Sequence, residues 1–281
     1  MKLTVLVDNN TITDSYYKGE PALSYHIEDG GKQILFDTGY SGIFIENAEK
    51  SGINLLMTDY IVLSHAHIDH TGGLPALMHY HEAAENSGAE RKRPVLIAHP
   101  DIFRTIEAEG FGNIGMPVSK EEVENFADII LTNSPFKITE RSTYLGETET
   151  LFDFESSQPT GFIPDGERDR MKPDPVKDDS AIVYSGKDGI FIITGCSHHG
   201  ICSVVEKAKQ VCPADKVTGV IGGFHLLNET EERLNKTAEY LSLNISGCIF
   251  PAHCTDLAAK TAILQKNKVR ETGSGCSYKL L

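Results

Sequence analysis

Two kinds of hydrophobic pattern alternate along the chain. Segments in which apolar residues alternate with polar ones, or run together between Gly, Asp and Asn, predict strands. These segments are residues 2–7, 22–28, 32–39, 59–67, 93–100, 216–227 and 247–254, together with a hairpin at 180–195. Segments with apolar residues three or four positions apart predict helices. These are residues 41–52, 74–88, 101–110, 203–212, 229–244 and 255–267.

The order of these elements indicates the fold class. Two strand-rich units, each followed by alternating helices and strands, predict a mixed α/β (α+β) fold in which two sheets face each other and helices cover both outer faces. We therefore expect a four-layer αββα sandwich, formed by a single domain over residues 1–281. The periodicity weakens between residues 111 and 177. This segment is predicted to be an irregular insertion or lid beside a functional site.

Composition and charge restrict the class of partner. The formal net charge is -14, which opposes binding to nucleic acid, because such binding depends on Lys and Arg neutralising phosphates. No apolar run approaches the roughly 18 residues that a membrane span needs, and residues 1–10 are typical of a strand rather than a secretion signal. We expect a cytoplasmic protein that binds a small molecule and no membrane; self-association into a homo-oligomer is compatible with this composition.

The cysteines do not indicate disulfides. All six lie beyond residue 195, in a chain for which no secretion signal is predicted, and no pair has C-x-x-C spacing. A disulfide framework or a zinc ribbon is therefore not expected. Most of these cysteines are expected to be small buried apolar residues.

Coordinating side chains are concentrated in the stretch "SHAHIDHTGGL", which follows a buried strand. At an extended strand end His65 and His67 point to the same side, so their rings can meet at one metal ion. Asp69 and His70 follow where the chain turns and can face a second ion. Imidazole and carboxylate ligands suit zinc, manganese or iron. A cluster of surface histidines is the alternative.

The motif H-x-H-x-D-H at residues 65–70 resembles the signature of the metallo-β-lactamase superfamily, and "FDTG" at 36–39 is similar to its earlier aspartate motif. The resemblance implies the metallo-β-lactamase fold and two divalent metal ions; zinc is the expected metal, with manganese, iron or magnesium as alternatives. It also implies that His65 and His67 bind the first ion and that Asp69 and His70 bind the second. His253, in "IFPAHC", corresponds to the family's late histidine, which completes the second site.

The chain departs from the family pattern where an aspartate normally bridges both ions. "TGCSHHG" stands at that place, so Cys196 occupies the position of the bridging aspartate. His198 is predicted to supply the remaining imidazole to the first ion. Cys196 and Asp179, the latter in "DDSAIV", are further candidate ligands.

Several motifs together resemble the group related to 7,8-dihydropterin-6-methyl-4-(β-D-ribofuranosyl)aminobenzene-5′-phosphate synthase. They are "LVDNN", "SHAHIDHTGGL", "DDSAIV", "TGCSHHGI", "IGGFHL" and "PAHCT". Asn9 and His225 lie at strand ends in these motifs and are candidate substrate-binding residues. Alternatively, Asn9 stabilises a turn and His225 is a core residue with satisfied hydrogen bonds.

The resemblance implies a metal-dependent enzyme that acts on a small anionic substrate, such as a phosphoester or a pterin phosphate. Asp69 and His70 are the predicted catalytic residues, because they bind the metal that activates water. The reaction is either hydrolysis or a metal-assisted pterin transfer in which diphosphate leaves. A di-iron redox protein is one alternative, although such relatives commonly have Glu where this chain has His67. A non-catalytic metal-binding sensor on the same fold is another.

Overall fold

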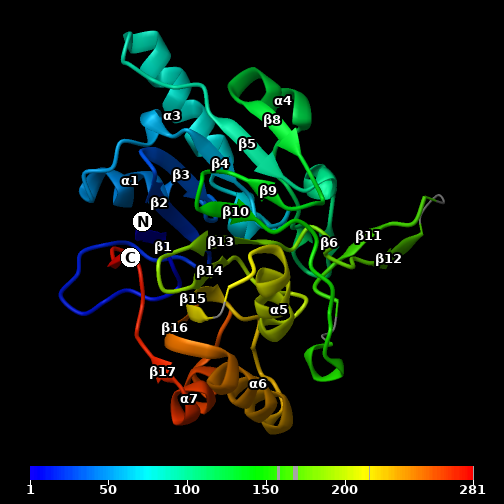
Figure 1. Cartoon of the computed structure of the whole chain (residues 1–281). Coiled ribbons are helices and arrows are strands. Elements are labelled where there is room, and N and C mark those ends of the chain that lie inside the picture. Colours follow the sequence, from blue (N-terminus) through cyan, green and yellow to red (C-terminus); the bar gives the residue numbers. More distant parts are fainter. Residues whose placement is uncertain (157–158, 167–169, 215, 281) are drawn as a thin grey trace.

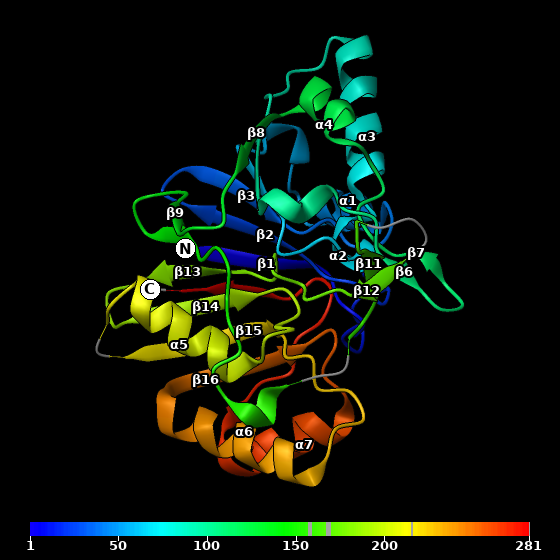
Figure 2. The ribbon, with the colours of Figure 1, turned by 90° about the vertical axis from the view of Figure 1, so that its right-hand side faces the viewer.

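The structure, a computed structural model, describes residues 1–156, 159–166, 170–214 and 216–280. Two seven-stranded sheets pack face to face, and helices cover the outer face of each. Figure 2 shows the four layers edge on, with α1 and α3 outside one sheet and α6 and α7 outside the other. The predicted αββα sandwich is confirmed.

The first sheet combines an antiparallel part with a parallel part. Its strand order is β18 (Ser277–Lys279), β1 (Lys2–Val7), β2 (Ser24–Asp29), β3 (Lys32–Phe36), β4 (Tyr60–Val62), β5 (Val95–Ala98) and β8 (Asp128–Leu131). The strands are parallel from β3 to β8 and antiparallel from β18 to β3. Its helices are α1 (Ile43–Lys50), α3 (Leu74–Ser87) and α4 (Lys120–Phe126).

The second sheet is built in the same way. Its strand order is β17 (Lys268–Val269), β16 (Ile245–Ala252), β15 (Val217–Gly223), β14 (Ile190–Thr194), β13 (Ala181–Ser185), β10 (Ser142–Tyr144) and β9 (Phe136–Lys137). The strands are parallel from β17 to β14 and antiparallel from β14 to β9. Helices α5 (Ile201–Val211), α6 (Glu231–Asn244) and α7 (Leu257–Lys266) cover it.

Both faces of each sheet are buried, which explains the uninterrupted apolar runs in the parallel strands. In β4, Ile61 packs towards the first helix layer and Val62 packs between the sheets. In β14, Ile192 packs towards the second helix layer and Ile193 packs between the sheets. This alternation decides which side chains face the helices and which lie between the two sheets.

The region between the two units differs from the prediction. The segment 101–110 is not a helix: a short 3₁₀ turn, η2 (Pro100–Phe103), leads into β6 (Glu107–Ala108), and Arg104 between them pairs with Asp174 and Asp178. The irregular segment predicted at 111–177 is shorter than expected, because α4 and β8 complete the first sheet unit and β9 and β10 extend the second. Residues 157–158 and 167–169 of that segment lie outside the described residues.

A small third sheet lies beside the two main sheets. It consists of β12 (Met171–Pro173), β11 (Phe162–Pro164), β6 and β7 (Gly112–Asn113). The hairpin β11–β12 projects from the body of the molecule (Figure 1). Short helical turns complete the fold: α2 (Ile68–Thr71), η1 (Leu55–Met57) and η3 (Asp153–Glu155). Within the described residues, no helix has both the length and the apolar character needed to cross a bilayer.

Candidate metal centre

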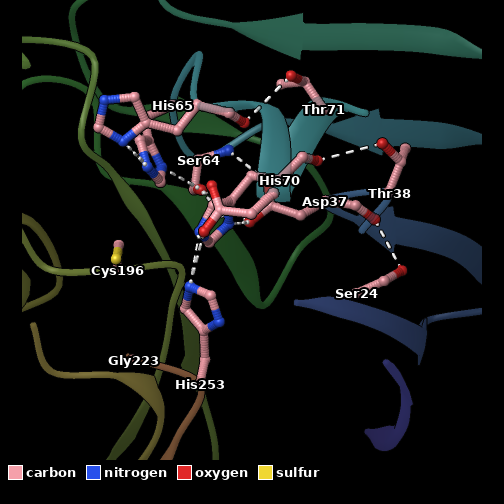
Figure 3. A network of polar contacts seen from close by, with 12 residues as sticks. Ser24, Asp37, Thr38, Ser64, His65, His70, Thr71, Cys196, Gly223 and His253 are labelled. Atoms are coloured by element: carbon pink, nitrogen blue, oxygen red, sulfur yellow. Dashed lines mark hydrogen bonds and ion pairs between the residues drawn. The ribbon is translucent and has the colours of Figure 1, made fainter. Parts of the chain in front are cut away.

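The candidate site lies where parallel strands of both sheets end side by side. The segments that follow β3, β4, β14, β15 and β16 all contribute polar side chains to it. Figure 3 shows His65 and His70 from the first sheet facing Cys196 and His253 from the second. The carboxyl edge of parallel strands is the usual place for a ligand site, because loops there can vary without disturbing the sheet.

Asp37 anchors the histidine turn of the first sheet. Its Oδ1 accepts the backbone N–H of Ser64 (2.7 Å), and its Oδ2 accepts the Ser64 hydroxyl and the Nδ1–H of His70, both at 2.7 Å. The carboxylate is fully buried. The hydrogen bonds to this one side chain therefore set both the start of the turn at Ser64 and the orientation of the His70 ring.

These hydrogen bonds also set which ring nitrogens are free. Because the Asp37 carboxylate accepts the proton on Nδ1 of His70, Nε2 of that ring presents its lone pair. The Ser64 hydroxyl donates to Asp37, so it accepts from His65 Nδ1 at 2.9 Å. His65 Nε2 then also presents a lone pair. Both rings have the tautomer that metal binding through Nε2 requires.

Three imidazoles form a first ligand group. His65 Nε2 lies 3.0 Å from His67 Nδ1 and 3.2 Å from His198 Nε2. Nitrogens bound to one zinc ion at about 2.0–2.1 Å in a tetrahedron are about 3.3–3.4 Å apart, so these separations fit a common ion. The structure thus brings His198 to the histidine pair, as the sequence predicts.

The first group is electrically suited to a cation. Burial lowers the pKa of His65 and His198 well below the usual value, and the neighbouring histidines lower it further. Burial also lowers the pKa of His67, against the opposing effect of Asp69. The three rings are therefore neutral near pH 7, which is the form that binds a metal ion.

A second ligand group contains a carboxylate. His253 Nε2 lies 3.2 Å from His70 Nε2 and 3.2 Å from Asp69 Oδ2, and His70 Nε2 lies 3.8 Å from the same Asp69 oxygen. The Asn9 side-chain oxygen lies 3.0 Å from His253 Nδ1, where it accepts the proton and directs Nε2 towards the group. Asp8 Oδ1 accepts the backbone N–H of His253 at 2.7 Å.

Opposite charges hold the second group together. Burial lowers the pKa of His253, but Cys254 and Asp69 outweigh this and raise it to about 9. Burial raises the pKa of Asp69, but His70 and His253 outweigh this and hold it well below its usual range. The same negative charge that raises the pKa of His253 would favour a divalent ion beside Asp69, and binding of that ion would displace the proton from His253 Nε2.

Cys196 follows β14 and lies between the two groups. Its Sγ is within 4.8 Å of the candidate ligand atoms of His65 and His198 on one side and of His70 and His253 on the other. It also lies 2.9 Å from Cys254 Sγ. Burial, followed by the contact with Cys254, raises the pKa of the Cys196 thiol well above its usual value.

The remaining predicted site residues lie around these groups. Asp179 Oδ2 accepts the backbone N–H of His199 at 3.3 Å, and burial raises the pKa of Asp179 to about 6. In the described part of the chain, Asp179 is not among the clustered candidate ligands. The His225 ring lies against that of His198, with the centroids 4.2 Å apart and the planes tilted by 44°, and its Nδ1 lies 3.5 Å from Cys196 Sγ. Asn9 contacts a metal ligand, so its predicted role in substrate binding stays a prediction.

Four residues at the site have a left-handed backbone conformation. The φ angles are 56° at Asp37, 59° at Ser197, 49° at His225 and 48° at His253. Such a conformation costs a non-glycine residue about 1–2 kcal/mol. The strand ends that carry the ligands are therefore held by the surrounding structure in conformations that their sequences do not favour.

Supporting residues were harder to identify from the sequence. Asp178 Oδ2 accepts the backbone N–H of Ala66 inside the histidine turn at 2.7 Å, and its Oδ1 accepts from Arg104 at 2.6 Å. The paired acids of "DDSAIV" were a signal, but their partners lie on distant segments. Ser64 and Cys254 gave no separate signal, because each is adjacent to a histidine that already explains its motif.

A cavity of about 330 Å³ opens beside the first ligand group. Its walls include His198, His199, Asp174 and Val176, and also Thr150, Ser156, Pro159, Thr160, Pro173 and Pro175. His199 has both ring nitrogens engaged, by the Thr150 hydroxyl (3.2 Å) and by the Val176 carbonyl (3.1 Å). A larger cavity of about 440 Å³ borders α3 and α4 and contains none of the candidate ligands.

Comparison with protein families identifies the group to which this architecture belongs. Residues 17–210 match the model of the metallo-beta-lactamase superfamily, including the histidine turn and the Cys196 segment. The chain belongs to the metallo-β-lactamase superfamily. Proteins with the metallo-β-lactamase fold bind divalent metals such as zinc, and the imidazole and carboxylate donors of the two ligand groups suit such ions.

Two similar proteins of Methanocaldococcus jannaschii cover nearly the whole chain. One is an uncharacterized protein, 34% identical over 94% of this chain and 94% of its own length. The other is 7,8-dihydropterin-6-methyl-4-(β-D-ribofuranosyl)-aminobenzene-5′-phosphate synthase, 31% identical over 95% of this chain and 92% of its own length. The predicted resemblance to this group of the metallo-β-lactamase superfamily is confirmed.

Solved structures share the fold. The crystal structure of Tm1679, a metal-dependent hydrolase of the β-lactamase superfamily, has a TM-score of 0.80 at 24% identity and covers 100% of this chain and 99% of its own. Zn(2+)-bound PqqB from Methylobacterium extorquens has a TM-score of 0.57 at 13% identity, with 100% of both chains covered. At these identities the likeness establishes the metallo-β-lactamase fold and leaves the reaction open.

Proposed function

We propose that the protein is an enzyme that holds two divalent ions and acts on a small anionic substrate, a phosphoester or a pterin phosphate. The observation that carries this proposal is the presence of two ligand groups, His65–His67–His198 and Asp69–His70–His253, at one strand edge. When bound there, two cations lower the pKa of a shared water and neutralise charge on an anionic group. Zinc is the metal that these ligands suit best.

The residues of the chain have separate tasks in this proposal. Asp37 and Ser64 fix the rings of His70 and His65, so no reorientation is needed when an ion binds. Asn9 does the same for His253. The Asp69 side chain is 31% exposed, so it can both bind an ion and accept a hydrogen bond from a nucleophile.

The cavity beside His198 gives space for the part of the substrate that does not react. Pro159, Pro173, Pro175 and Val176 form the apolar part of its otherwise polar lining, and an aromatic ring can pack against them. The overall charge of -14 makes the bound ions the main attraction for an anion and opposes a nucleic-acid substrate. A small phosphorylated molecule with a planar ring satisfies both features.

Hydrolysis and transfer differ in the group that attacks. In hydrolysis, water attacks phosphorus and the ester oxygen leaves. In transfer, a nucleophile of the acceptor bonds to the pterin methyl carbon as the carbon–oxygen bond to diphosphate breaks. The similarity to the synthase supports transfer, and the fold it shares with a metal-dependent hydrolase is compatible with hydrolysis.

Metal content tests the ion count. Untagged protein, loaded with zinc and freed of excess, is compared with His198→Ala and His253→Ala by elemental analysis. We expect about two ions in the unmodified protein and about one or fewer in each variant. His79→Ala is the control, because that side chain is 83% exposed on α3, and it should keep both ions. Fewer than two ions in the unmodified protein would contradict the proposal.

Product analysis then tests the reaction. The zinc-loaded protein is incubated with a phosphodiester and, separately, with a hydroxymethyl dihydropterin diphosphate with and without an arylamine acceptor. Condensed product that requires the acceptor indicates transfer, whereas release of alcohol or phosphate without it indicates hydrolysis. Loss of a residue that only supports a metal ligand lowers activity by up to about 100-fold. The reaction rate of His198→Ala should fall by more than this, because His198 itself is a proposed ligand. If neither substrate class reacts, the proposed activity is wrong even where two ions are present.

A further inference from the structure

The position of Cys196 suggests a role in the metal centre that a buried thiol would not have. Among the residues that the structure describes, Cys196 forms one cluster of candidate ligands with His65 and His198 and a second with His70 and His253. Its Sγ is the one ligand atom that these two clusters share. We infer that the Cys196 thiolate binds both ions and replaces the carboxylate that bridges them in the superfamily. This inference rests on the proposed two-ion centre.

The dimensions of a sulfur bridge agree with a two-ion site. Zinc–sulfur bonds are about 2.3 Å long, and ions of dinuclear sites lie about 3.5–4 Å apart. A sulfur bound to both ions then subtends an angle of about 100–120°. One sulfur atom can therefore bind two ions at this separation.

Two glycines allow the approach of Cys196 to both groups. A Cβ on Gly195 would lie 2.2 Å from Ser64 Oγ and 3.2 Å from Asp37 Oδ2, so only glycine lets the end of β14 pack against the anchor of the histidine turn. A Cβ on Gly223 would lie 2.6 Å from Cys254 Sγ. The close packing of strand ends that places Cys196 between the groups thus depends on both glycines.

Cys254 has a different position. Its Sγ accepts the backbone N–H of His225 at 3.2 Å and clusters with Cys196 and His225 only. The Cys254 Sγ lies 2.9 Å from the Cys196 Sγ, so it contacts the ligating sulfur without joining either ligand group. Side chains that touch a ligand atom orient it and tune its affinity for the ion. Cys254 is therefore a positioning residue and not a ligand.

Zinc X-ray absorption on the loaded, anaerobic protein tests the bridge. A shared thiolate gives one sulfur neighbour per zinc at about 2.3 Å, because each of two ions sees the same atom. A thiolate on one ion alone gives half a sulfur per zinc. We expect one sulfur per zinc in the unmodified protein and none in Cys196→Ser.

Matched variants identify the source of the sulfur. Cys254→Ser and Cys202→Ser, the latter a fully buried cysteine on α5, should keep one sulfur per zinc. Cys196→Asp should hold two ions with no sulfur neighbour, because it restores a bridging carboxylate. With cobalt in place of zinc, the sulfur-to-metal charge-transfer band should be absent from both Cys196 variants and present in the other two. These spectra do not depend on any substrate.

Several outcomes would overturn the inference. A shared Cys196 thiolate would be excluded by half a sulfur per zinc, by no sulfur, or by sulfur retained in Cys196→Ser. In each of these cases, a content of two ions per chain would still support the proposed function. Halving of the count in Cys254→Ser would show that each cysteine binds one ion. Fewer than two ions in the unmodified protein would overturn the bridge and the two-ion proposal together. The unmodified protein is informative by itself, should a variant not fold.

Discussion

The two sides of the metal centre are held in different ways. The first sheet presents four candidate ligands within residues 65–70, and hydrogen bonds from the Asp37 carboxylate and the Asp178 side chain fix that turn. The second sheet presents Cys196 and His198 after β14 and His253 after β16, and each of these two loops contains a left-handed residue. The first side can therefore be recognised from one local motif, whereas the second has to be put together from two motifs far apart in the chain.

Removal of the ions should affect the second side most. A ligand at 1,000 times its dissociation constant stabilises the folded state by about 4 kcal/mol, so chelation should lower the midpoint of thermal unfolding clearly. Amide hydrogen exchange should then increase after β14, β15 and β16, and change little in the turn that Asp37 anchors. Equal increases on both sides would contradict the difference proposed here. In His67→Ala, chelation should have a smaller effect on unfolding.

Asp37→Ala should damage the first side at the level of the fold. It removes the acceptor of the Ser64 N–H, the Ser64 hydroxyl and His70 Nδ1. Each buried donor left without a partner costs about 1–3 kcal/mol, so urea unfolding of the metal-free protein should show a loss of at least about 3 kcal/mol. Asp128→Ala is the control, since that carboxylate is 69% exposed in its pair with Arg93, and it should change stability by less than about 0.5 kcal/mol.

Asn9→Ala should weaken one ion selectively. Its side-chain oxygen orients His253, which belongs to the second ligand group, so affinity for the second-side ion should fall about 10–100-fold. Zinc titration against a chromophoric chelator measures both affinities. Asn10→Ala, which removes a hydrogen bond to the Thr272 carbonyl, should leave them unchanged. Equal weakening of both ions would show that Asn9 acts on the whole centre.

Substitution of Ser197 tests backbone strain alone, and its expected effect on stability is the smallest. Ser197→Gly and Ser197→Ala lose the same hydroxyl contacts with Thr194 and the Gly223 carbonyl, but glycine tolerates the φ of 59°. The glycine variant should be more stable than the alanine variant by up to about 1 kcal/mol in urea unfolding. At Ser24, in the regular strand β2, the order should reverse, because glycine weakens a strand. The same order at both positions would exclude strain as the cause.

The difference between the sides also decides what the sequence could predict. The layers followed from apolar runs, because strands buried on both faces differ clearly from amphipathic helices. The ligands at 65–70 followed from local spacing. The contacts of Asp178 with Ala66 and of Asn9 with His253 join segments far apart in the chain, and no local pattern records them. The predicted helix at 101–110 was wrong because Arg104 pairs with distant acids.

The separation of the ligands along the chain has a consequence for the order of folding. His65 and His198 are 133 residues apart, and His70 and His253 are 183 residues apart. Contacts that close such long loops are slow to form, since the entropy of loop closure must be overcome before they stabilise anything. We expect the two halves to collapse and dock without help from metal. An ion can meet its full set of ligands only afterwards, so its uptake marks the end of folding rather than its beginning.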